Sequence, residues 1–190
     1  MTFTEILHQT CFALMIAVAF VAVAVSVERL IFTHANFRRA RDLLERLRET
    51  RVVSDAHLGH DVVSSLVTEL RGIADRARGA EEQQNLQDAA YLHARDALDQ
   101  RLWVLDTVVT AAPLLGLLGT IFGIVETFMV LSSSGMSDPA GISAGIGTAL
   151  YATALGISIA LIGLLCFNYL SRANERLGEY LKIIILKTAH

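Results

Sequence analysis

The stretch LLGLLGTIFGIVETF, residues 114–128, decides the fold class of this chain. It is apolar enough to lie in a membrane, yet it contains three glycines, two threonines and one glutamate. A helix that only anchors a protein in lipid has no need for such residues. The question is therefore what the small and polar side chains of this stretch face.

The composition points to a membrane protein with one charged region. Of the 190 residues, 53% are hydrophobic and 18% are charged, whereas about 25% is usual in soluble domains. Residues 33–101 contain 11 arginines and 12 acidic residues, and the rest of the chain contains only 12 charged residues. The net charge of −3 gives no indication of a nucleic-acid surface.

The order of apolar and charged runs predicts an all-α integral membrane protein with three transmembrane helices, because each apolar run reaches the roughly 20 residues that cross a bilayer. Pro139 suits the first turn of the third long helix. Spans two and three are predicted to be long and to extend into a helical region. The predicted segments are an N-terminal stretch (1–10), span one (11–32), a charged helical region (33–101), span two (102–131), a short turn (132–141), span three (142–170) and a C-terminal helix (171–190).

The basic residues predict the orientation of these spans. All 16 lysines and arginines lie between Arg29 and Arg101 or after Leu170. The positive-inside rule therefore places the N-terminus and the short turn on the outer, periplasmic side, and the charged region and the C-terminus in the cytoplasm.

Small residues recur at helical spacing in spans two and three. In lipid, such ladders let two helix backbones approach closely, so they indicate helix–helix contacts. The residues predicted to pack helices together are Gly116, Gly119, Gly123, Gly145, Ala149, Ala152 and Gly156.

Three threonines lie at mid-depth in these spans, Thr120 in the second and Thr148 and Thr153 in the third. Each could simply bond the carbonyl four residues before it. Together they instead suggest a lining that holds water or an ion. Thr148 and Thr153 are about 140° apart around a helix, so they cannot both face one narrow line.

Two further residues of span two are unusual in a membrane helix. An acid at the centre of a span costs about 2.5–3.5 kcal/mol. Glu126, however, is near the outer end, where it fits an outer vestibule or a partner contact, a proton relay, or a solvated residue without a role. Pro113 is expected to bend or loosen the helix on the inner side of Thr120.

Catalytic and metal sites are not indicated. The sequence has no nucleophile–base pair, phosphate loop or metal cluster, so the protein is predicted not to be an enzyme and to have no metal or other cofactor. His57 and His60 lack a third ligand. Cys11 and Cys166 are expected near opposite membrane faces, where they are ordinary thiols.

Two motifs together carry a resemblance to a known family. APLLGLLGTIFGIVETF (112–128) and GISAGIGTALYATALGISIALIGLLCFNYL (141–170) resemble the two core spans of the MotA/TolQ/ExbB proton-channel family, most closely its ExbB and TolQ branch. The VERL ending of span one, residues 27–30, and the three-span layout fit as well, whereas the charged region matches loosely.

The resemblance implies a homopentamer around a central pore that holds a dimer of a single-span, ExbD- or TolR-like partner. The proton-carrying aspartate belongs to that partner, and the pentamer adds a ring of threonines, here Thr120 and Thr153 by motif. Proton flow then drives a motor that works, through a TonB- or TolA-like periplasm-spanning protein, on import or other tasks at the outer membrane. The resemblance also implies that H⁺ is the coupling ion and that the protein lies in the bacterial inner membrane.

The sequence departs from the family pattern at one point. The family usually reads GIAEALxATA in span three, whereas this chain reads GIGTALYATA, with Thr148 in place of the acid. Either that acid is dispensable here, or Glu126 supplies one elsewhere, or the pore carries Na⁺.

Two readings of another kind stay open. A non-conducting oligomeric membrane scaffold would use the same glycine ladders. A small secondary transporter is disfavoured by the short chain and the lack of an inverted repeat.

Overall fold

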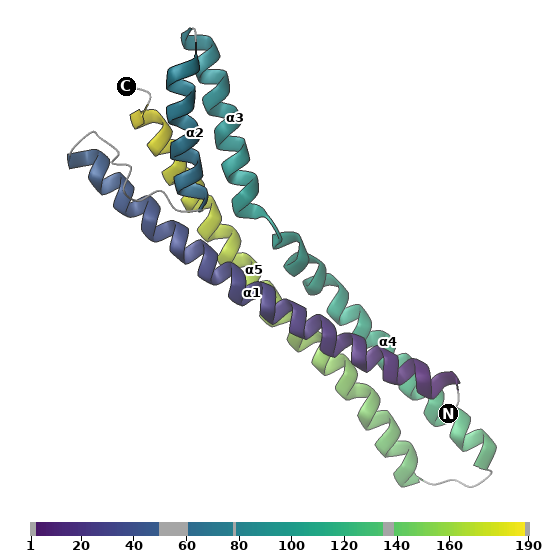
Figure 1. The fold of residues 1–190 in the computed structure, drawn as a ribbon. Helices are drawn as coiled ribbons and strands as arrows, with labels where there is room; N and C mark the ends of the chain where they lie inside the picture. The colour runs from purple at the N-terminus through teal and green to yellow at the C-terminus, as the bar shows by residue number, and fades with distance from the viewer. Residues whose placement is uncertain (1–2, 50–60, 78, 135–138, 189–190) are drawn as a thin grey trace. The chain divides into compact units, whose positions relative to one another are not determined.

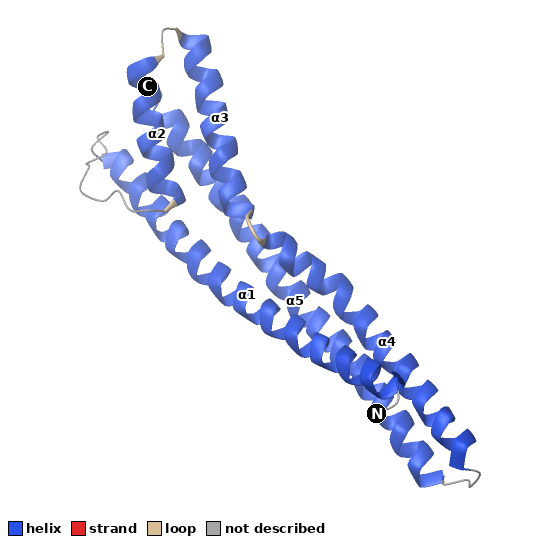
Figure 2. Ribbon diagram, turned by 45° about the vertical axis from the view of Figure 1, so that its right-hand side comes forward, coloured by secondary structure: helices blue, strands red, loops and turns tan. Residues whose placement is uncertain are grey.

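The computed structural model describes residues 3–49, 61–77, 79–134 and 139–188. The turn predicted for residues 132–141 has its centre, residues 135–138, outside this described part, and His57 and His60 lie outside it as well. All secondary structure in the described ranges is α-helical (Figures 1 and 2). The helices are α1 (Phe3–Glu49), α2 (Val62–Arg76), α3 (Ala80–Asp99), α4 (Leu102–Ser134) and α5 (Pro139–Thr188).

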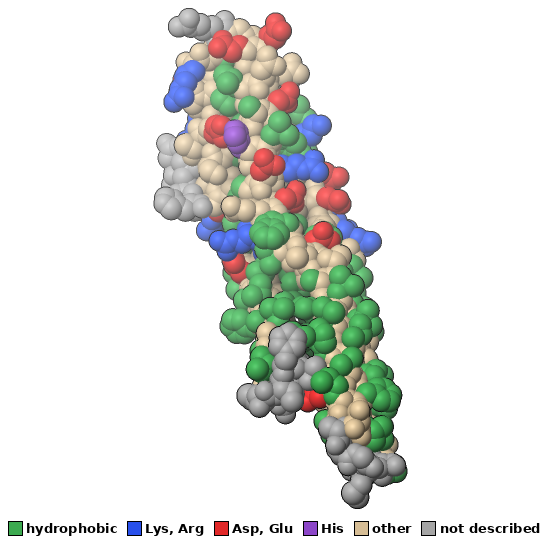
Figure 3. Space-filling model, turned by 90° about the vertical axis from the view of Figure 1, so that its right-hand side faces the viewer, with side chains coloured by type: hydrophobic (Ala, Val, Ile, Leu, Met, Phe, Trp, Pro, Cys, Tyr) green, Lys and Arg blue, Asp and Glu red, His purple; other side chains and the backbone are tan. Residues whose placement is uncertain are grey.

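The chain forms two compact units. The first, called the apolar unit, consists of Met1–Val27 and Trp103–Phe167; the second, called the charged unit, consists of Glu28–Leu102 and Asn168–His190. Helices α1 and α5 are each divided between the two units, with one part in each unit. On the face in Figure 3, acidic and basic side chains gather over the charged unit and hydrophobic ones over the apolar unit.

The long helices follow from the sequence pattern. Helix α1 does not end with its apolar run at Phe32 but continues to Glu49, because Leu43 and Leu44 keep one side apolar. Helix α5 begins at Pro139, which needs no backbone N–H partner in a first turn. Among the described residues, three helical segments are long and apolar enough to cross a membrane: Gln9–Arg46, Ala80–Ser132 and Pro139–Lys187.

The charged unit has a hydrophobic core of large side chains. Leu66 from α2, Leu98 from α3 and Leu181 from α5 are each at most 2% exposed. The ring of Phe37 in α1 meets that of Tyr180 in α5 edge-on, with 5.2 Å between ring centroids. Four helical segments thus enclose one core, as in a water-soluble bundle.

Asn174 ties three helices of the charged unit together. Its Nδ2 donates to the carbonyl oxygen of Leu98 at 2.7 Å and lies 3.2 Å from Asp99 Oδ1, while its Oδ1 accepts from Thr33 Oγ1 at 3.2 Å. Leu98 is in the last turn of α3, where carbonyls lack helical partners. A buried amide from α5 therefore caps α3.

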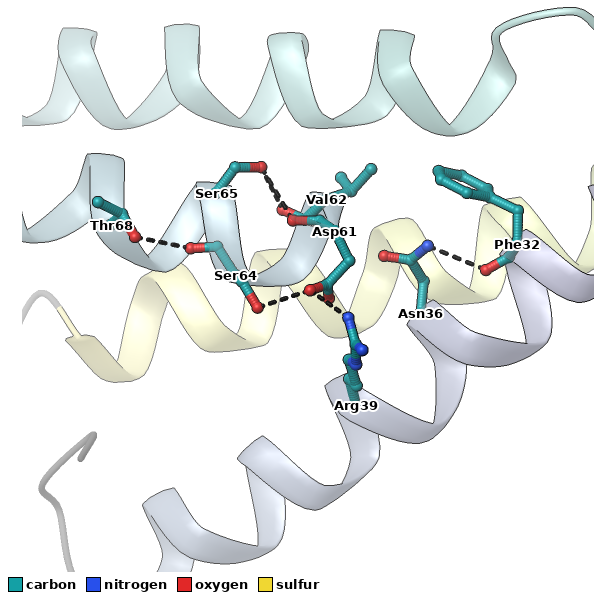
Figure 4. A network of polar contacts seen from close by, with 8 residues as sticks. All are labelled: Phe32, Asn36, Arg39, Asp61, Val62, Ser64, Ser65 and Thr68. Carbon is teal, nitrogen blue, oxygen red and sulfur yellow. Dashed lines mark hydrogen bonds and ion pairs between the residues drawn. The ribbon is translucent and has the colours of Figure 1, made fainter. Parts of the chain in front are cut away.

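The beginning of α2 is fixed by the carboxylate of Asp61. Its Oδ1 accepts a hydrogen bond from Ser64 Oγ at 2.8 Å and pairs with the guanidinium of Arg39 (Figure 4). Asn36, one turn before Arg39, donates to the carbonyl oxygen of Phe32 at 2.9 Å. The ion pair between Arg39 and Asp61 holds the beginning of α2 against α1, whereas the bond of Asn36 lies within α1 itself.

Helices α3 and α4 are separated by a short break at Gln100 and Arg101. Arg101 has φ 69°, and among the described non-glycine residues it is the one with positive φ. Its guanidinium also pairs with Glu28 of α1. Because the left-handed region is unfavourable for residues with a Cβ, this break stores strain.

Candidate functional site

The closest approach of α4 and α5 in the apolar unit is made by glycines. A Cβ atom on Gly156 would lie 2.5 Å from the carbonyl oxygen of Ala112 and 3.0 Å from Gly116 Cα. One on Gly116 would lie 2.9 Å from the carbonyl oxygen of Ala152. These neighbours are backbone atoms that cannot turn aside, so the two helices meet here because the side chains are absent.

The next turn of this contact also includes α1. A Cβ atom on Gly119 would lie 2.8 Å from Ala152 Cβ and 3.7 Å from Cys11 Sγ. The thiol of Cys11 donates to the carbonyl oxygen of Leu115 at 3.2 Å. Cys11 is thus part of a three-helix contact, a role that the sequence did not suggest because nothing around Cys11 distinguishes it from an ordinary thiol.

The contact continues toward the ends of α4 and α5 that the short turn joins. Gly145 leaves room for Thr127, whose Oγ1 donates to the carbonyl oxygen of Gly123 at 2.8 Å. Gly123 is buried, and Ala149 is 0% exposed. All seven small residues singled out in the sequence therefore lie on the buried or half-buried side of their helices.

Thr120 and Thr153 meet across this contact. Their hydroxyl oxygens are hydrogen-bonded to each other, and both side chains are half-buried. Thr120 Oγ1 is 3.1 Å from the carbonyl oxygen of Gly116 and 3.2 Å from that of Ala149, and Thr153 Oγ1 is 3.1 Å from that of Gly116. Thr120 reaches this carbonyl from one turn along its own helix, whereas Thr153 of α5 comes close because Gly116 has no side chain: a Cβ there would lie 3.1 Å from Thr153 Cα.

The two threonine hydroxyls have more hydrogen-bond acceptors around them than they have protons to donate. Each threonine has a single O–H to donate, whereas two backbone carbonyls and the other hydroxyl are within reach. The bond between the hydroxyls can therefore run in either direction, with the outer proton on a carbonyl of α4 or of α5. Either hydroxyl can therefore form hydrogen bonds as a donor or as an acceptor, and none of the contacts of the two hydroxyls is with a base.

Thr148 is not brought to this pair. It is exposed on α5, and its hydroxyl donates to the carbonyl oxygen of Ala144 at 3.0 Å. The angle of about 140° between positions 148 and 153 explains why only one of them reaches α4. Thr148 instead belongs to an uncovered face of the single chain.

Glu126 and Pro113 lie on either side of the hydroxyl pair along α4. Glu126 is half-buried and follows Thr120 by six residues, about 9 Å along the helix axis. Helix α4 runs through Pro113 without interruption, although proline removes one helical hydrogen bond there. Neither side chain takes part in the contacts of Thr120 and Thr153.

No group of three or more histidine, cysteine or acidic side chains among the described residues is arranged to hold a metal ion. Cys11 and Cys166 are both free thiols. Within the described part of the apolar unit, the candidate functional site is therefore the hydroxyl pair of Thr120 and Thr153 in its glycine-lined contact.

Comparison with known proteins identifies the family. The sequence pattern of the MotA/TolQ/ExbB proton channel family matches residues 56–182, which include the whole α4–α5 contact. The chain belongs to this family. Its members are membrane channel and transport proteins, in agreement with the three apolar helices of this multi-pass membrane protein.

Individual relatives lie in the ExbB and TolQ branch. The chain is 38% identical over 84 residues to the biopolymer transport protein ExbB of Aquifex aeolicus, covering 44% of this chain and 57% of that protein. It is 40% identical over 91 residues to ExbB of Helicobacter pylori, covering 48% and 61%. The Tol-Pal system protein TolQ of Haemophilus influenzae is 36% identical over 86 residues, covering 45% and 38%. The matched region is thus less than two thirds of each relative.

Proposed function

We propose that the chain is the pentameric subunit of an ion-driven motor in the bacterial inner membrane. In this motor, proton flow would drive work at the cell envelope, of the TonB or Tol type. The partner would be a dimer of a single-span, ExbD- or TolR-like protein inside the pore, and a TonB- or TolA-like protein would carry the work across the periplasm. The charged unit would lie in the cytoplasm, as the positions of the basic residues favour.

The observation that carries this proposal is the meeting of Thr120 and Thr153. They are the two threonines that match the family motifs, and their hydroxyls share one hydrogen-bond network with the carbonyl of Gly116. In the assembled pore, this pair would exchange a hydrogen bond with the protonated carboxyl of the partner's aspartate, or with a water beside it. Switching the direction of the bond between the hydroxyls lets the pair accept and donate in turn.

Two residues receive lesser roles in the proposed motor. Thr148 is exposed in the single chain, so it is available to a pore or to a neighbouring copy, but without the acid that the family usually has there. Glu126 is proposed as a contact of the outer vestibule or of the partner, because it follows the hydroxyl pair toward the predicted outer side. Removal of its charge by Glu126→Gln should therefore reduce transport less than loss of the hydroxyl pair.

The first test is the composition of the complex. The chain would be co-expressed with the neighbouring reading frame, extracted gently and weighed by native mass spectrometry. Five copies of the chain with two of a single-span protein are expected. A pentamer that never retains a partner would favour the scaffold, and a monomer or dimer would refute the motor.

The second test addresses the hydroxyl pair in proteoliposomes with an imposed pH gradient. Thr120→Val removes the hydroxyl and keeps the shape, so it should leave the pentamer intact and reduce proton flux by roughly 10²-fold, the lower end of what one positioned proton-transfer group contributes. Thr120→Ser should restore the flux. The control is Thr110→Val on the same helix, since Thr110 is exposed and bonds carbonyls of its own helix. Flux that follows a Na⁺ gradient instead would identify a Na⁺-driven member.

A further inference from the structure

Arg29 of α1 is a buried cation with unused hydrogen-bond donors. The residue is 4% exposed, and its Nε and Nη1 atoms are buried with no acceptor within reach among the described residues. A guanidinium stays charged in proteins and carries five N–H donors. Buried charges are normally paired, and an unpaired one is costly. The Arg29 guanidinium therefore needs an acceptor that the single chain does not supply.

The side chains next to Arg29 on α1 do not meet this need. The ring of Phe32 lies over the guanidinium, with 5.0 Å between Cζ and the ring centroid. Such a ring attracts the charge through its face but takes none of the N–H groups that point outward in the guanidinium plane. Thr33, one turn along the helix, donates its hydroxyl to Asn174 Oδ1 at 3.2 Å.

A second arginine is held beside Arg29 by a strained backbone. Arg101 has φ 69° at the break between α3 and α4, and its guanidinium pairs with Glu28 of α1. The charges of Glu28 and Arg101 are the two that act on the Arg29 guanidinium. Strain of this kind persists only where the surrounding structure holds it, and it is found preferentially at ligand sites. Here the strained break brings a second guanidinium to α1.

Arg29, Arg101 and Glu28 are called the arginine cluster, and their charges do not balance. Two guanidinium groups meet one carboxylate, which leaves one positive charge in excess. The side chains of Arg101 and Glu28 are 53% and 49% exposed, so the cluster can be reached from outside through them. An anion would neutralise the excess, whereas a water molecule would accept hydrogen bonds without balancing the charge.

The arginine cluster lies where the first apolar run of the chain ends. Arg29 is the first basic residue of the sequence. Leu30 and Ile31, which follow it, are 38% and 67% exposed. Exposed apolar side chains directly beside a cluster of charges fit the boundary between hydrocarbon and headgroups, where arginine reaches the phosphates. Basic pockets between membrane helices on the cytoplasmic side bind anionic headgroups.

We propose that the arginine cluster binds a phosphate-type anion, and that its position favours the phosphodiester of an anionic lipid. Guanidinium groups match phosphate oxygens in both charge and geometry. The phosphate accepts hydrogen bonds from Arg29 and Arg101, and Leu30 and Ile31 are available to the acyl chains. The cluster thus fixes the depth of α1 in the membrane. This inference does not depend on the proposed motor.

Thermal unfolding of the full chain in a non-ionic detergent tests the site. Phosphatidylglycerol, phosphatidylcholine and inorganic phosphate are titrated separately, because a ligand of the folded state raises Tm with its concentration. Phosphatidylglycerol should raise Tm, with one lipid per chain retained in native mass spectra, whereas phosphatidylcholine should have little effect. An equal rise with inorganic phosphate would support the site and identify a free anion as its ligand.

Three variants assign the binding to the cluster. Arg29→Met removes the charge at similar volume, so the affinity for phosphatidylglycerol should fall roughly tenfold or more, as expected for a lost hydrogen bond to a charged group. Arg172→Met is the matched control, because Arg172 is exposed and follows the predicted end of span three at Leu170. It should keep the affinity. Glu28→Gln removes the acid that competes for Arg101 and should raise the affinity.

Two results would overturn the site. One is an equal loss of affinity in Arg29→Met and Arg172→Met, which indicates diffuse attraction of the headgroups to basic residues. The other is a Tm of the unchanged chain that responds to none of the three compounds. Arg29→Lys keeps the test valid if Arg29→Met does not fold, since it retains the charge but loses the planar group. Its affinity should be lower than that of the unchanged chain, and equal affinities would contradict the proposal.

Discussion

The two units of this protein differ in the size of the side chains that are buried within each of them. The largest fully buried side chains, apart from Leu105, belong to the charged unit, for example Leu66, Leu177 and Leu181. The buried positions of the apolar unit are instead dominated by glycine and alanine, such as Gly116, Ala149 and Ala152. Large leucines and isoleucines are plentiful there too, but they lie outside: Leu161 is 58% exposed and Ile157 is 54% exposed.

The difference shows which force acts on each unit. In water, burying a leucine is favourable by itself, so large side chains collect in the core. In lipid, a leucine gains little by leaving the hydrocarbon, and helices associate through close backbone packing and hydrogen bonds. The inverted pattern of the apolar unit is therefore what a lipid-embedded helix bundle requires.

The largest expected effect is the loss of a core leucine from the charged unit. Leu181 is 0% exposed, so Leu181→Ala should lower the free energy of unfolding by about 2–5 kcal/mol. Leu161→Ala, the same change at an exposed position of the apolar unit, should change it by less than about 0.5 kcal/mol. Thermal unfolding of both variants in the same detergent measures the contrast. Equal losses would show that Leu161 is buried by something that the single chain does not include.

A single added methyl group should have a similar effect on the apolar unit. Gly156→Ala places a Cβ 2.5 Å from the carbonyl oxygen of Ala112, so α4 and α5 must separate, at a loss of about 1–3 kcal/mol. Gly147→Ala is the matched control on the same helix, because no atom lies within 4 Å of the added Cβ. There the higher helix propensity of alanine should stabilise the protein slightly. Protease resistance of α4 in membranes reports both changes, and an unaffected Gly156→Ala would contradict the close contact.

The hydroxyl pair should contribute less than the glycines do. Thr153→Val removes a hydrogen bond between α4 and α5 and should cost about 1 kcal/mol, in the range measured between membrane helices. Thr148→Val removes only a bond to the preceding turn of the same helix, so stability should hardly change. Unfolding of the two variants side by side distinguishes the contacts. A larger loss for Thr148→Val would place that residue, rather than Thr153, in the helix–helix contact.

How much of this could be predicted differs between the two units as well. Composition and spacing are enough to predict the three apolar helices, the start of α5 at Pro139 and the packing role of Gly116 and Gly156. The reason is that a membrane helix needs a long apolar run, and close helix packing in lipid needs small residues at helical spacing. The meeting of Thr120 with Thr153 could be anticipated only from the family motifs, since spacing excludes one of Thr148 and Thr153 but does not choose between them. The bonds of Cys11 and Asn174 depend on how separate helices are rotated, and no local pattern records this.

The break between α3 and α4 lies at the predicted boundary between residues 101 and 102, but its left-handed conformation could not be predicted. It is the subject of the smallest expected effect. The local sequence, DQRLW, contains no glycine or asparagine, yet Arg101 adopts φ 69°. Arg101→Gly removes the penalty of a Cβ in the left-handed region, about 1 kcal/mol, and loses an exposed ion pair with Glu28 that is worth roughly 0.2–1 kcal/mol. Its stability should therefore stay nearly unchanged or rise slightly.

Arg101→Ala is the control for the stability of Arg101→Gly, because it loses the same ion pair but keeps the Cβ. It should be less stable than Arg101→Gly by about 1 kcal/mol, whereas at an ordinary helical position alanine is the more stable of the two. Glu28→Gln reports the ion pair separately. If alanine proves the better residue at position 101, the left-handed break does not persist in the membrane-bound protein, and α3 and α4 form one continuous helix there.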